Sequence, residues 1–355
     1  MKTTITGVEI TGIASAVPEK WCSLEEQFGS LSDEEIKTAK KFRKSTGVNG
    51  RYLCGNRQTA SDLCFAAADK LLAEKNIDRN KIGVLVFVTQ TEDYRSPASA
   101  FVIQHRLGIG KSCIVFDVNL GCSGFTCGLN IVSSILLQSD AEYGLLLCGD
   151  TSARERNPDR SVFVSNSDKM LFGDSGTATL LRKNSSAKEM LMLSASDGDG
   201  FKKIVTPYEW YRNPKRSDGE TLMDGISVFN FSTEEAPAMI NDLMREAGTA
   251  PEDYDCLVLH QANIMIIDRI AKLTGFTKEQ NIRSIDTFGN TSSGSIPNTL
   301  VHNFGGESER SVIRCMMCGY GVGLSWSAVD CYLDKKDILP LIHTDEYFDD
   351  GMHID

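Results

Sequence analysis

Cys122 is the residue whose surroundings point most clearly to chemistry. It lies in "DVNLGCSGFTCGL" (117–129), between Gly121 and Gly124, where an apolar run of strand length gives way to an apolar helical stretch. Open α/β folds bind ligands at the carboxyl ends of strands, and the N–H groups and dipole of a following helix favour a thiolate. The flanking glycines permit a sharp turn and the close approach of a substrate, and the Cys122 N–H is placed to act as an oxyanion donor. From these features alone, a nucleophile and a buried structural thiol are equally well supported at Cys122, whereas Cys127, one helical turn later, lacks them and is expected to be a packed thiol in the core.

A nucleophilic cysteine needs partners, and the sequence offers five histidines. His343 and His353 belong to the acidic C-terminal end, His105 to a short helical stretch and His302 to an apolar one. Only His260 follows a buried-strand pattern, "CLVLH", and precedes a turn into a helix. A histidine in that place is either a hydrogen-bonded structural residue or a catalytic one, and the residue types alone leave both open.

Asn290 completes the candidate set. It lies in "TFGNTSSGSIPN" (287–298), a glycine- and serine-rich turn that by composition alone is an ordinary loop. A cysteine, a histidine and an asparagine without a carboxylate resemble a thioester site more than a metal site. The chain has no Cys-x-x-Cys pair and its histidines are scattered, so we expect no zinc site and no other cofactor.

The composition limits the classes of function. The chain has 355 residues, 41% hydrophobic and 24% charged, with a net charge of −11, which disfavours nucleic-acid and anionic-membrane roles. We find no secretory signal pattern and no apolar stretch near the roughly 20 residues of a membrane span. The eleven cysteines then indicate reduced thiols in a cytoplasmic protein. One basic segment, "KTAKKFRKSTG" (37–47), is either a solvated helix face or a landing site for an anionic partner.

The elements that would position these residues alternate between strands and helices. The first half predicts strands over 8–18, 82–90, 112–119 and 143–153, helices over 59–77, 96–108 and 123–138, and two short extended pieces around a glycine turn over 170–183. The second half predicts helices over 234–248 and 262–275, strands over 254–261, and a strand pair over 311–333, with Gly275 as a C-terminal helix cap.

The two halves echo each other, because a helix is followed by a buried strand at nearly the same spacing in both. We therefore expect an α/β protein with an N-terminal half (1–185) that carries Cys122 and a C-terminal half (186–355) that carries His260 and Asn290. An acidic tail begins at about residue 334. The pattern alone leaves open whether the halves arose by duplication.

Five segments occur in an order that resembles a known family. They are "VNLGCSGFTCGL", "FGDSGTATLL", "LHQANIMII", "GNTSSGSIP" and "GYGVGLSWS". They are similar to the signature blocks of the β-ketoacyl-acyl-carrier-protein synthase III family, in the thiolase-like superfamily, over about residues 5–333. The resemblance implies a five-layered αβαβα fold of two duplicated halves, usually assembled as a homodimer.

The resemblance also implies a reaction, a decarboxylative Claisen condensation in fatty acid biosynthesis or in a specialised lipid or secondary-metabolite pathway. Cys122 would take an acyl group from an acyl-CoA or acyl-carrier-protein donor, and the carbanion formed from malonyl-acyl-carrier protein would attack the acyl-Cys. His260 Nε2 and the Asn290 amide would stabilise that enolate-like carbanion. The backbone N–H groups of Cys122 and Gly323 would form a second oxyanion hole.

The sequence departs from the family pattern at several contacts. The Trp and Arg that commonly hold the coenzyme A adenine align with Lys41 and Asn166, and an aromatic residue that commonly gates the partner's acyl pocket aligns with Ser96. An Arg that helps to dock the carrier protein is Met265, although Lys272 keeps one basic position on that helix. A specialised relative is therefore as well supported as a fatty-acid initiation enzyme.

The residues leave two alternative functions open besides the condensing enzyme. The first is acyl transfer to an alcohol or amine without decarboxylation, which does not need Asn290. The second is a catalytically silent partner subunit of a condensing enzyme. The presence of Cys122, His260 and Asn290 favours the condensing enzyme over both.

Overall fold

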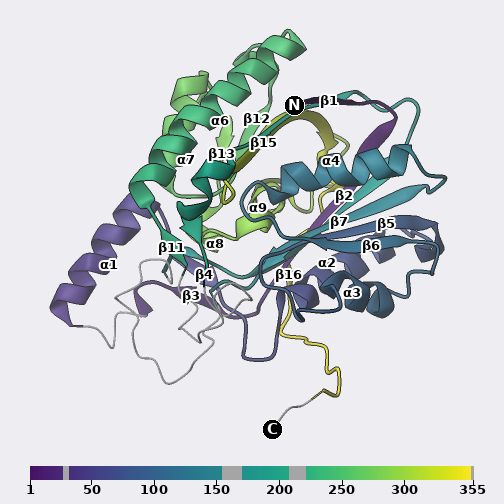
Figure 1. Cartoon of the computed structure of the whole chain (residues 1–355), viewed down its shortest axis with the longest axis horizontal. Coiled ribbons are helices and arrows are strands. Elements are labelled where there is room, and N and C mark those ends of the chain that lie inside the picture. The colour runs from purple at the N-terminus through teal and green to yellow at the C-terminus, as the bar shows by residue number, and fades with distance from the viewer. Residues whose placement is uncertain (27–31, 154–169, 208–220, 353–355) are drawn as a thin grey trace.

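A computed structural model describes residues 1–26, 32–153, 170–207 and 221–352 of the chain, and two six-stranded sheets organise them (Figure 1). The first sheet has the order β16-β2-β8-β7-β5-β6 and consists of β2 (Val8–Val17), β5 (Ile82–Val88), β6 (Ile114–Val118), β7 (Tyr143–Asp150), β8 (Ser175–Lys183) and β16 (Ile342–His343). The second has the order β1-β9-β15-β14-β12-β13 and consists of β1 (Lys2–Ile5), β9 (Met190–Ser196), β12 (Cys256–Leu259), β13 (Asn281–Ile282), β14 (Val312–Gly321) and β15 (Ser325–Asp334).

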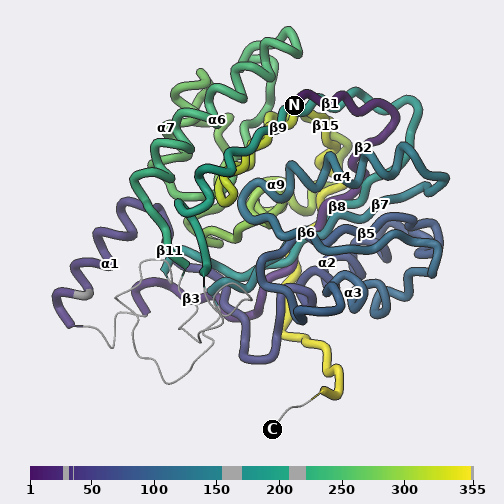
Figure 2. Tube along the Cα trace, in the orientation of Figure 1, coloured from purple at the N-terminus to yellow at the C-terminus, as the bar shows by residue number. Residues whose placement is uncertain are grey.

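Helices lie between the sheets and on both outer faces, as Figure 2 shows. The middle layer contains α4 (Gly124–Leu137) and α9 (Ser295–Phe304). The outer layers are α2 (Ala60–Glu74) with α3 (Ser99–Leu107) on the first sheet, and α6 (Gly225–Ala247) with α7 (Ile264–Thr274) on the second. The five-layered αβαβα arrangement implied by the sequence motifs is confirmed.

The remaining elements connect these layers. They are α1 (Asp33–Thr46), α8 (Ile285–Phe288), β3 (Trp21–Ser23), β4 (Gly50–Tyr52), β10 (Ile204–Val205), β11 (Leu222–Met223), and the 3₁₀ turns η2 (Arg79–Lys81), η3 (Gly198–Lys202), η4 (Pro251–Asp253), η5 (Ser292–Gly294) and η6 (Lys335–Asp337).

Burial of apolar side chains on both faces of the sheets explains this layering. Leu129 of α4 and Leu300 of α9 belong to one buried cluster with Val86 of β5 and Met317 of β14, so the middle helices seal both sheets at once. The continuous apolar run of β5 has the sequence expected of a strand covered on both faces. The predicted C-terminal cap of α7 is confirmed, because Gly275 has a left-handed φ of 79°.

The two sheets exchange strands at the chain ends. The predicted boundary at 185/186 falls in the connection between β8 and β9, yet β1 pairs with β9 of the second sheet and β16 pairs with β2 of the first. Each half therefore completes the sheet of the other.

The prediction of two short extended pieces over 170–183 is wrong. Residues Ser175–Lys183 form one continuous strand, β8, between β2 and β7. Its Gly176 permits close packing rather than a turn, because a Cβ there would lie 2.3 Å from the backbone nitrogen of Cys64 in α2. A glycine that permits close packing resembles a turn glycine in sequence.

The acidic tail is fastened to the first half of the chain. Beyond β16, Gln58 Nε2 donates to the carbonyls of Thr344 (2.8 Å) and Glu346 (3.0 Å). The Phe348 backbone N–H donates to Asp62 Oδ1 at 2.9 Å. Within the described part of the chain, no helix has the length and apolarity required to cross a bilayer.

Candidate active site

Cys122 lies in the turn between β6 and α4, two residues before α4 begins. The turn is packed closely on both sides. A Cβ on Gly121 would lie 2.4 Å from Gln90 Oε1, and a Cβ on Gly321 would lie 2.6 Å from the Cβ of Cys122. Both glycines are required because neighbouring protein atoms occupy the space that a side chain would need.

The Cys122 thiol is neutral near physiological pH. Burial raises its pKa to about 11, and a hydrogen bond from the Val322 backbone N–H acts in the opposite direction. The nearby Asp150 carboxylate raises the pKa further. Burial thus outweighs the preference for a thiolate expected at the start of a helix.

His260 follows β12 directly and is 1% exposed. Its Nδ1 lies 2.7 Å from Ser295 Oγ, and its backbone N–H donates to the Cys318 carbonyl at 2.9 Å. The Tyr320 hydroxyl donates to the His260 carbonyl at 3.0 Å, and the two rings meet edge to face. Burial lowers the pKa of the imidazole to about 3, against a smaller opposing contact with the Ser292 backbone. His260 is therefore a neutral, rigidly held imidazole.

Asn290 is held with its amide nitrogen available. The Ser292 backbone N–H donates to Asn290 Oδ1 at 2.9 Å, while the Asn290 backbone pairs with Leu171 and Gly173. Ser292 adopts a left-handed φ of 51°, which bends its N–H back toward the side chain. No hydrogen bond joins Asn290 Nδ2 to another residue of the described chain. The side chain therefore presents its NH₂ group as a donor.

Shared neighbours bring the two halves together around Cys122. The end of β14 separates Cys122 from His260, since its Cys318 carbonyl accepts from His260 and its Gly321 abuts the Cys122 sulfur. The turn that follows Asn290 reaches the end of β5, where Ser293 Oγ donates to the Val88 carbonyl at 3.2 Å. It also reaches the start of α4, because a Cβ on Gly124 would lie 3.2 Å from the Cβ of Ser293. The three predicted residues thus come from three turns that are linked through β14, the end of β5 and the start of α4.

The backbone amide that contacts the cysteine belongs to Val322, one residue before Gly323, the second predicted oxyanion donor. A Cβ on Gly323 would contact Ser325, not Cys122. The amide that reaches Cys122 Sγ is that of Val322. The role of Gly323 stays a prediction, and the contact favours Val322 for it.

Sequence reasoning missed Asp150, a buried carboxylate at the end of β7. Its oxygens accept from the Gln90 backbone N–H (2.7 Å), Thr89 Oγ1 (3.2 Å) and Ser293 Oγ (3.2 Å). Burial raises the pKa of this carboxyl. Asp150 ties the loop after β5 to the turn that carries Asn290, and its only signal in the sequence was a polar residue at the end of a buried strand.

The other predicted positions are scattered. Lys272 and Met265 lie exposed on α7, and Lys41 lies exposed on α1. Ser96 precedes Pro97 on the surface, before α3. Asn166 and His353 lie outside the described residues.

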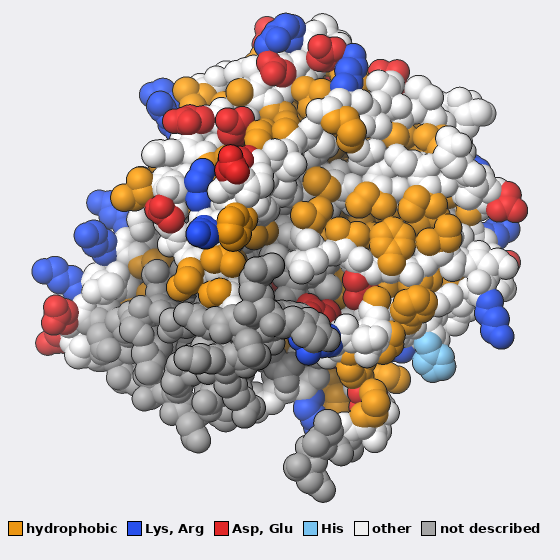
Figure 3. Space-filling model, in the orientation of Figure 1, with side chains coloured by type: hydrophobic (Ala, Val, Ile, Leu, Met, Phe, Trp, Pro, Cys, Tyr) orange, Lys and Arg blue, Asp and Glu red, His pale blue; other side chains and the backbone are white. Residues whose placement is uncertain are grey.

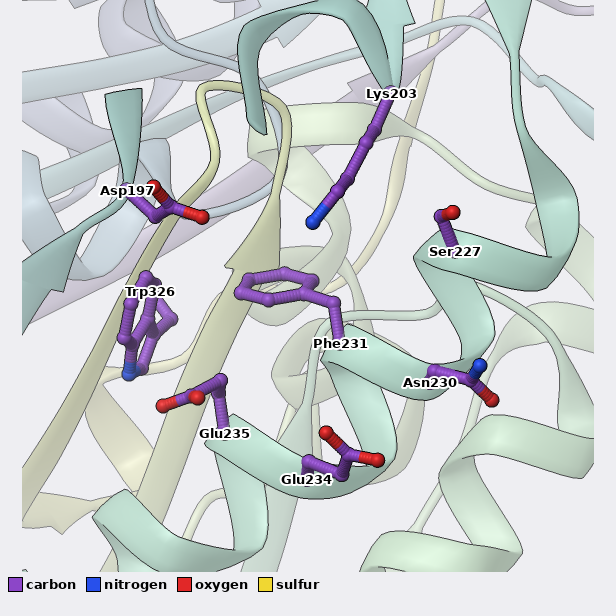
Figure 4. A pocket seen from close by; sticks show the side chains of 8 residues that line it. All are labelled: Asp197, Lys203, Ser227, Asn230, Phe231, Glu234, Glu235 and Trp326. Carbon is purple, nitrogen blue, oxygen red and sulfur yellow. The ribbon is translucent and has the colours of Figure 1, made fainter. Parts of the chain in front are cut away.

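A cavity of about 380 Å³ opens between α6 and η3, and its lining does not include Cys122, His260 or Asn290 (Figure 4). Lys203 extends across it above Phe231, opposite Trp326. The cavity borders the turn that carries Val322, because the backbones of Asp197 and Leu324 exchange two hydrogen bonds of 2.9 Å.

Metal-binding clusters are absent from the described residues, since no group of three His, Cys, Asp or Glu side chains there is arranged to hold a metal ion. All eleven cysteines are free thiols.

Comparison with known proteins identifies the family. The family model described as 3-oxoacyl-[acyl-carrier-protein (ACP)] synthase III matches residues 116–200, and the model of its C-terminal part matches residues 244–331. A β-ketoacyl-[acyl-carrier-protein] synthase III of Staphylococcus saprophyticus is 30% identical, over 91% of this chain and 97% of the relative. The chain belongs to the β-ketoacyl-[acyl-carrier-protein] synthase III family. The same identity, over 82% of this chain, holds for a synthase III of Rhizorhabdus wittichii.

Solved structures of synthase III proteins share the fold over nearly the whole chain. A 3-oxoacyl-(acyl-carrier protein) synthase from Burkholderia xenovorans superposes with a TM-score of 0.90 at 29% identity, covering 97% of this chain and 99% of that one. This coverage is too high to leave out the whole acidic tail. The predicted family and thiolase-like fold are confirmed, and the chain is a condensing enzyme of the transferase class.

Proposed function

We propose that this protein is an acyltransferase that condenses an acyl thioester with malonyl-acyl-carrier protein through an acyl-Cys122 intermediate. One observation carries the proposal. The end of β14 contacts both the neutral His260 and Cys122, and the free amide nitrogen of Asn290 belongs to a turn that reaches the start of α4, beside Cys122. Two uncharged donors beside a cysteine suit a reaction that develops negative charge on a thioester oxygen.

In the first half-reaction, Cys122 Sγ attacks the carbonyl carbon of the acyl thioester. The bond from that carbon to the donor sulfur breaks, and the leaving thiolate takes up the proton that the Cys122 thiol loses. The tetrahedral oxyanion is stabilised by backbone N–H groups of Cys122 and of the turn at Val322 and Gly323. Since the pKa of Cys122 is about 11, the thiol gives up its proton during this step and not before.

In the second half-reaction, the carbon–carbon bond to the malonyl carboxylate breaks and CO₂ leaves. The electron pair passes to an enolate whose oxygen accepts from His260 Nε2 and Asn290 Nδ2. The donor tautomer of His260 requires Nδ1 to accept from Ser295 Oγ, which the 2.7 Å contact allows. The carbanion then attacks the acyl-Cys122 carbonyl carbon, the bond from that carbon to Cys122 Sγ breaks, and the released thiolate takes up a proton from solvent.

The low pKa of His260 has a chemical consequence for this step. An imidazolium would protonate the carbanion and end the reaction in an unextended thioester. A neutral imidazole stabilises the enolate oxygen by hydrogen bonding without being a strong acid. The pKa of about 3 keeps His260 in this form.

The exposed edge of the first sheet supports a homodimer. The edge strand β6 exposes 54% of Ile114, and the neighbouring helix α3 exposes 48% of Phe101. Phe116 and Val118 of the same strand are only partly buried. Figure 3 shows apolar side chains gathered around α4 and β6. An apolar sheet edge of this kind favours pairing with a second copy.

The cysteines support a reducing compartment for this enzyme. All eleven are free thiols, and seven of them are buried. We infer a cytoplasmic location on this basis.

The test is a condensation assay with purified carrier protein. Acyl-CoA and acyl-carrier-protein donors are supplied separately with malonyl-carrier protein, and CO₂ and β-ketoacyl product are both quantified. We expect one CO₂ for each product, and we expect His260→Ala and Asn290→Ala to lose condensation while Cys122 is still acylated. Acyl transfer without CO₂ release would reassign the chain to a non-decarboxylating acyltransferase, and no transfer from any donor would make it a silent subunit.

A further inference from the structure

We propose that the hydroxyl pair formed by Ser123 and Ser325 positions the Val322 turn against Cys122 for catalysis. The Val322 turn is residues 322–324, which connect β14 to β15. The inference rests on the proposed function, and it deepens that function by naming two positioning residues that act through the Val322 N–H.

The Ser123 hydroxyl does not cap its own helix. Ser123 directly follows Cys122 and is the N-cap residue of α4, yet its side chain makes no capping hydrogen bond. A serine at this position usually accepts from the first free N–H groups of the helix. Ser123 Oγ instead lies 2.6 Å from Ser325 Oγ, 202 residues later in the chain. Because Ser123 is only 1% exposed, this contact takes the place of both the cap and solvent.

The two hydroxyls form a chain of hydrogen bonds with one direction. Ser325 Oγ donates to the Val322 carbonyl at 2.8 Å. A hydroxyl carries a single hydrogen, so Ser325 accepts from Ser123 across the 2.6 Å contact. The Cys127 thiol contacts the Ser123 hydroxyl from the next turn of α4. Ser123 thus supports Ser325, and Ser325 alone contacts the Val322 turn.

The hydroxyl pair acts between two other fixed points of the Val322 turn. Before the turn, Gly321 abuts the cysteine, since a Cβ there would lie 2.8 Å from Cys122 Sγ. At the end of the turn, Leu324 exchanges two backbone hydrogen bonds of 2.9 Å with Asp197. The bond from the hydroxyl pair holds the Val322 carbonyl between these points. A fixed carbonyl limits rotation about the two free backbone bonds of Val322 and therefore limits the direction of its N–H.

The Val322 N–H has two effects at Cys122. It donates to the sulfur in the free enzyme and opposes the burial that raises the pKa of the thiol to about 11. In the proposed mechanism, the same N–H stabilises the tetrahedral oxyanion. Displacement of the Val322 turn should therefore raise the pKa of Cys122 further and slow its acylation. A hydroxyl pair that served only to stabilise the fold would change neither property.

A second serine pair provides a matched control. Ser194 Oγ of β9 and Ser327 Oγ of β15 lie 2.9 Å apart. Ser194 is adjacent in sequence neither to Cys122 nor to the Val322 turn. Ser194→Ala therefore removes the same group from the same kind of pair without releasing the Val322 carbonyl.

The experiment measures acylation of Cys122 by acyl-CoA in the full-length wild type, Ser123→Ala, Ser325→Ala, the double variant and Ser194→Ala. We expect the maximal rate of acylation to fall about tenfold in Ser123→Ala and about thirtyfold in Ser325→Ala, with KM for acyl-CoA within about twofold of wild type. The double variant should match Ser325→Ala, because Ser123 acts through Ser325. Ser194→Ala should stay within about twofold of wild type in both quantities.

Alkylation of Cys122 by iodoacetamide separates positioning from a general loss of stability. Iodoacetamide is small and forms no oxyanion, so its rate at a given pH reports the fraction of thiolate. We expect this rate to fall about threefold in Ser325→Ala at pH 8, because the thiolate loses the Val322 N–H. The melting curve should change no more than it does in Ser194→Ala.

Acylation of Ser325→Ala at the wild-type rate overturns the positioning role. An equal loss in Ser194→Ala does so too, as does a loss in the double variant equal to the product of the two single losses. Slower acylation of Ser325→Ala with an unchanged rate of alkylation also overturns it, because the Val322 N–H would not have moved. Absence of acylation in the wild type with every donor instead overturns the proposed function itself.

Discussion

Exchange of Asn290 for Asp or Ala tests the role assigned to its amide nitrogen. Asp keeps an oxygen that can accept from the Ser292 N–H, which now bonds to Asn290 Oδ1 at 2.9 Å, so the turn keeps its anchor. The NH₂ group that we propose as a donor to the enolate becomes a carboxylate oxygen. Loss of one such donor costs about 2.7–4 kcal/mol in the transition state, or roughly 10²–10³ in rate. We expect Asn290→Ala to lose condensation by about this factor.

Asn290→Asp should be at least as damaging as Asn290→Ala. The side chain is only 5% exposed, so the new charge would be poorly solvated and would repel the developing enolate. This order separates a lost donor from a disturbed loop, because the Ala variant removes the anchoring oxygen and the Asp variant retains it.

The assay follows CO₂ release, β-ketoacyl formation and the acyl adduct on Cys122 separately for both variants. Acylation should stay within about twofold of wild type, because it uses backbone donors and not Asn290. The reasoning is refuted if Asn290→Asp condenses within tenfold of wild type, or if acylation falls as far as condensation does.

Three further outcomes follow from the geometry. Gly321→Ala should stop acylation without unfolding the protein, because its Cβ would lie 2.6 Å from the Cβ of Cys122; adduct mass and a melting curve check both parts. Alkylation of Cys122 by iodoacetamide should rise about tenfold for each pH unit up to about pH 11, and a plateau near neutral pH contradicts the raised pKa. Arg106→Ala should lower the free energy of unfolding in urea by about 3–5 kcal/mol, because Asp62 would keep a buried charge without its partner. A loss below about 1 kcal/mol argues against a stabilising role for the Arg106–Asp62 pair.

The sequence predicted most of the long elements, because their signals are local and repeated. One exception is α6, which begins at Gly225 and not at the predicted residue 234. The apolar run of β5 and the helical spacing of α7 with Gly275 each specify one structure. The exchange of strands between the two sheets could not be predicted from the sequence. β1 has four residues and β16 has two, which are too few to show the alternation of apolar and polar residues typical of a strand. β8 was divided in two because Gly176 resembles a turn residue until α2 is seen against it.

The candidate site shows a similar division. Cys122, His260 and Asn290 each lie next to a helix or strand, and the five ordered sequence motifs distinguished them from the other candidate residues. Asp150 was missed because its hydrogen-bond partners come from distant parts of the chain. The raised pKa of Cys122 also depends on how much protein surrounds the thiol, which no local pattern reports.

The most direct test of the account is the identity of the acylated residue. The enzyme is incubated with acyl-CoA and acyl-carrier-protein donors, and the adduct is located by peptide mass spectrometry in wild type, Cys122→Ala and the control Cys127→Ala. We predict a single acyl adduct on Cys122 that is absent from Cys122→Ala and kept in Cys127→Ala. An adduct that persists in Cys122→Ala, or one located on Cys127, would contradict the central claim.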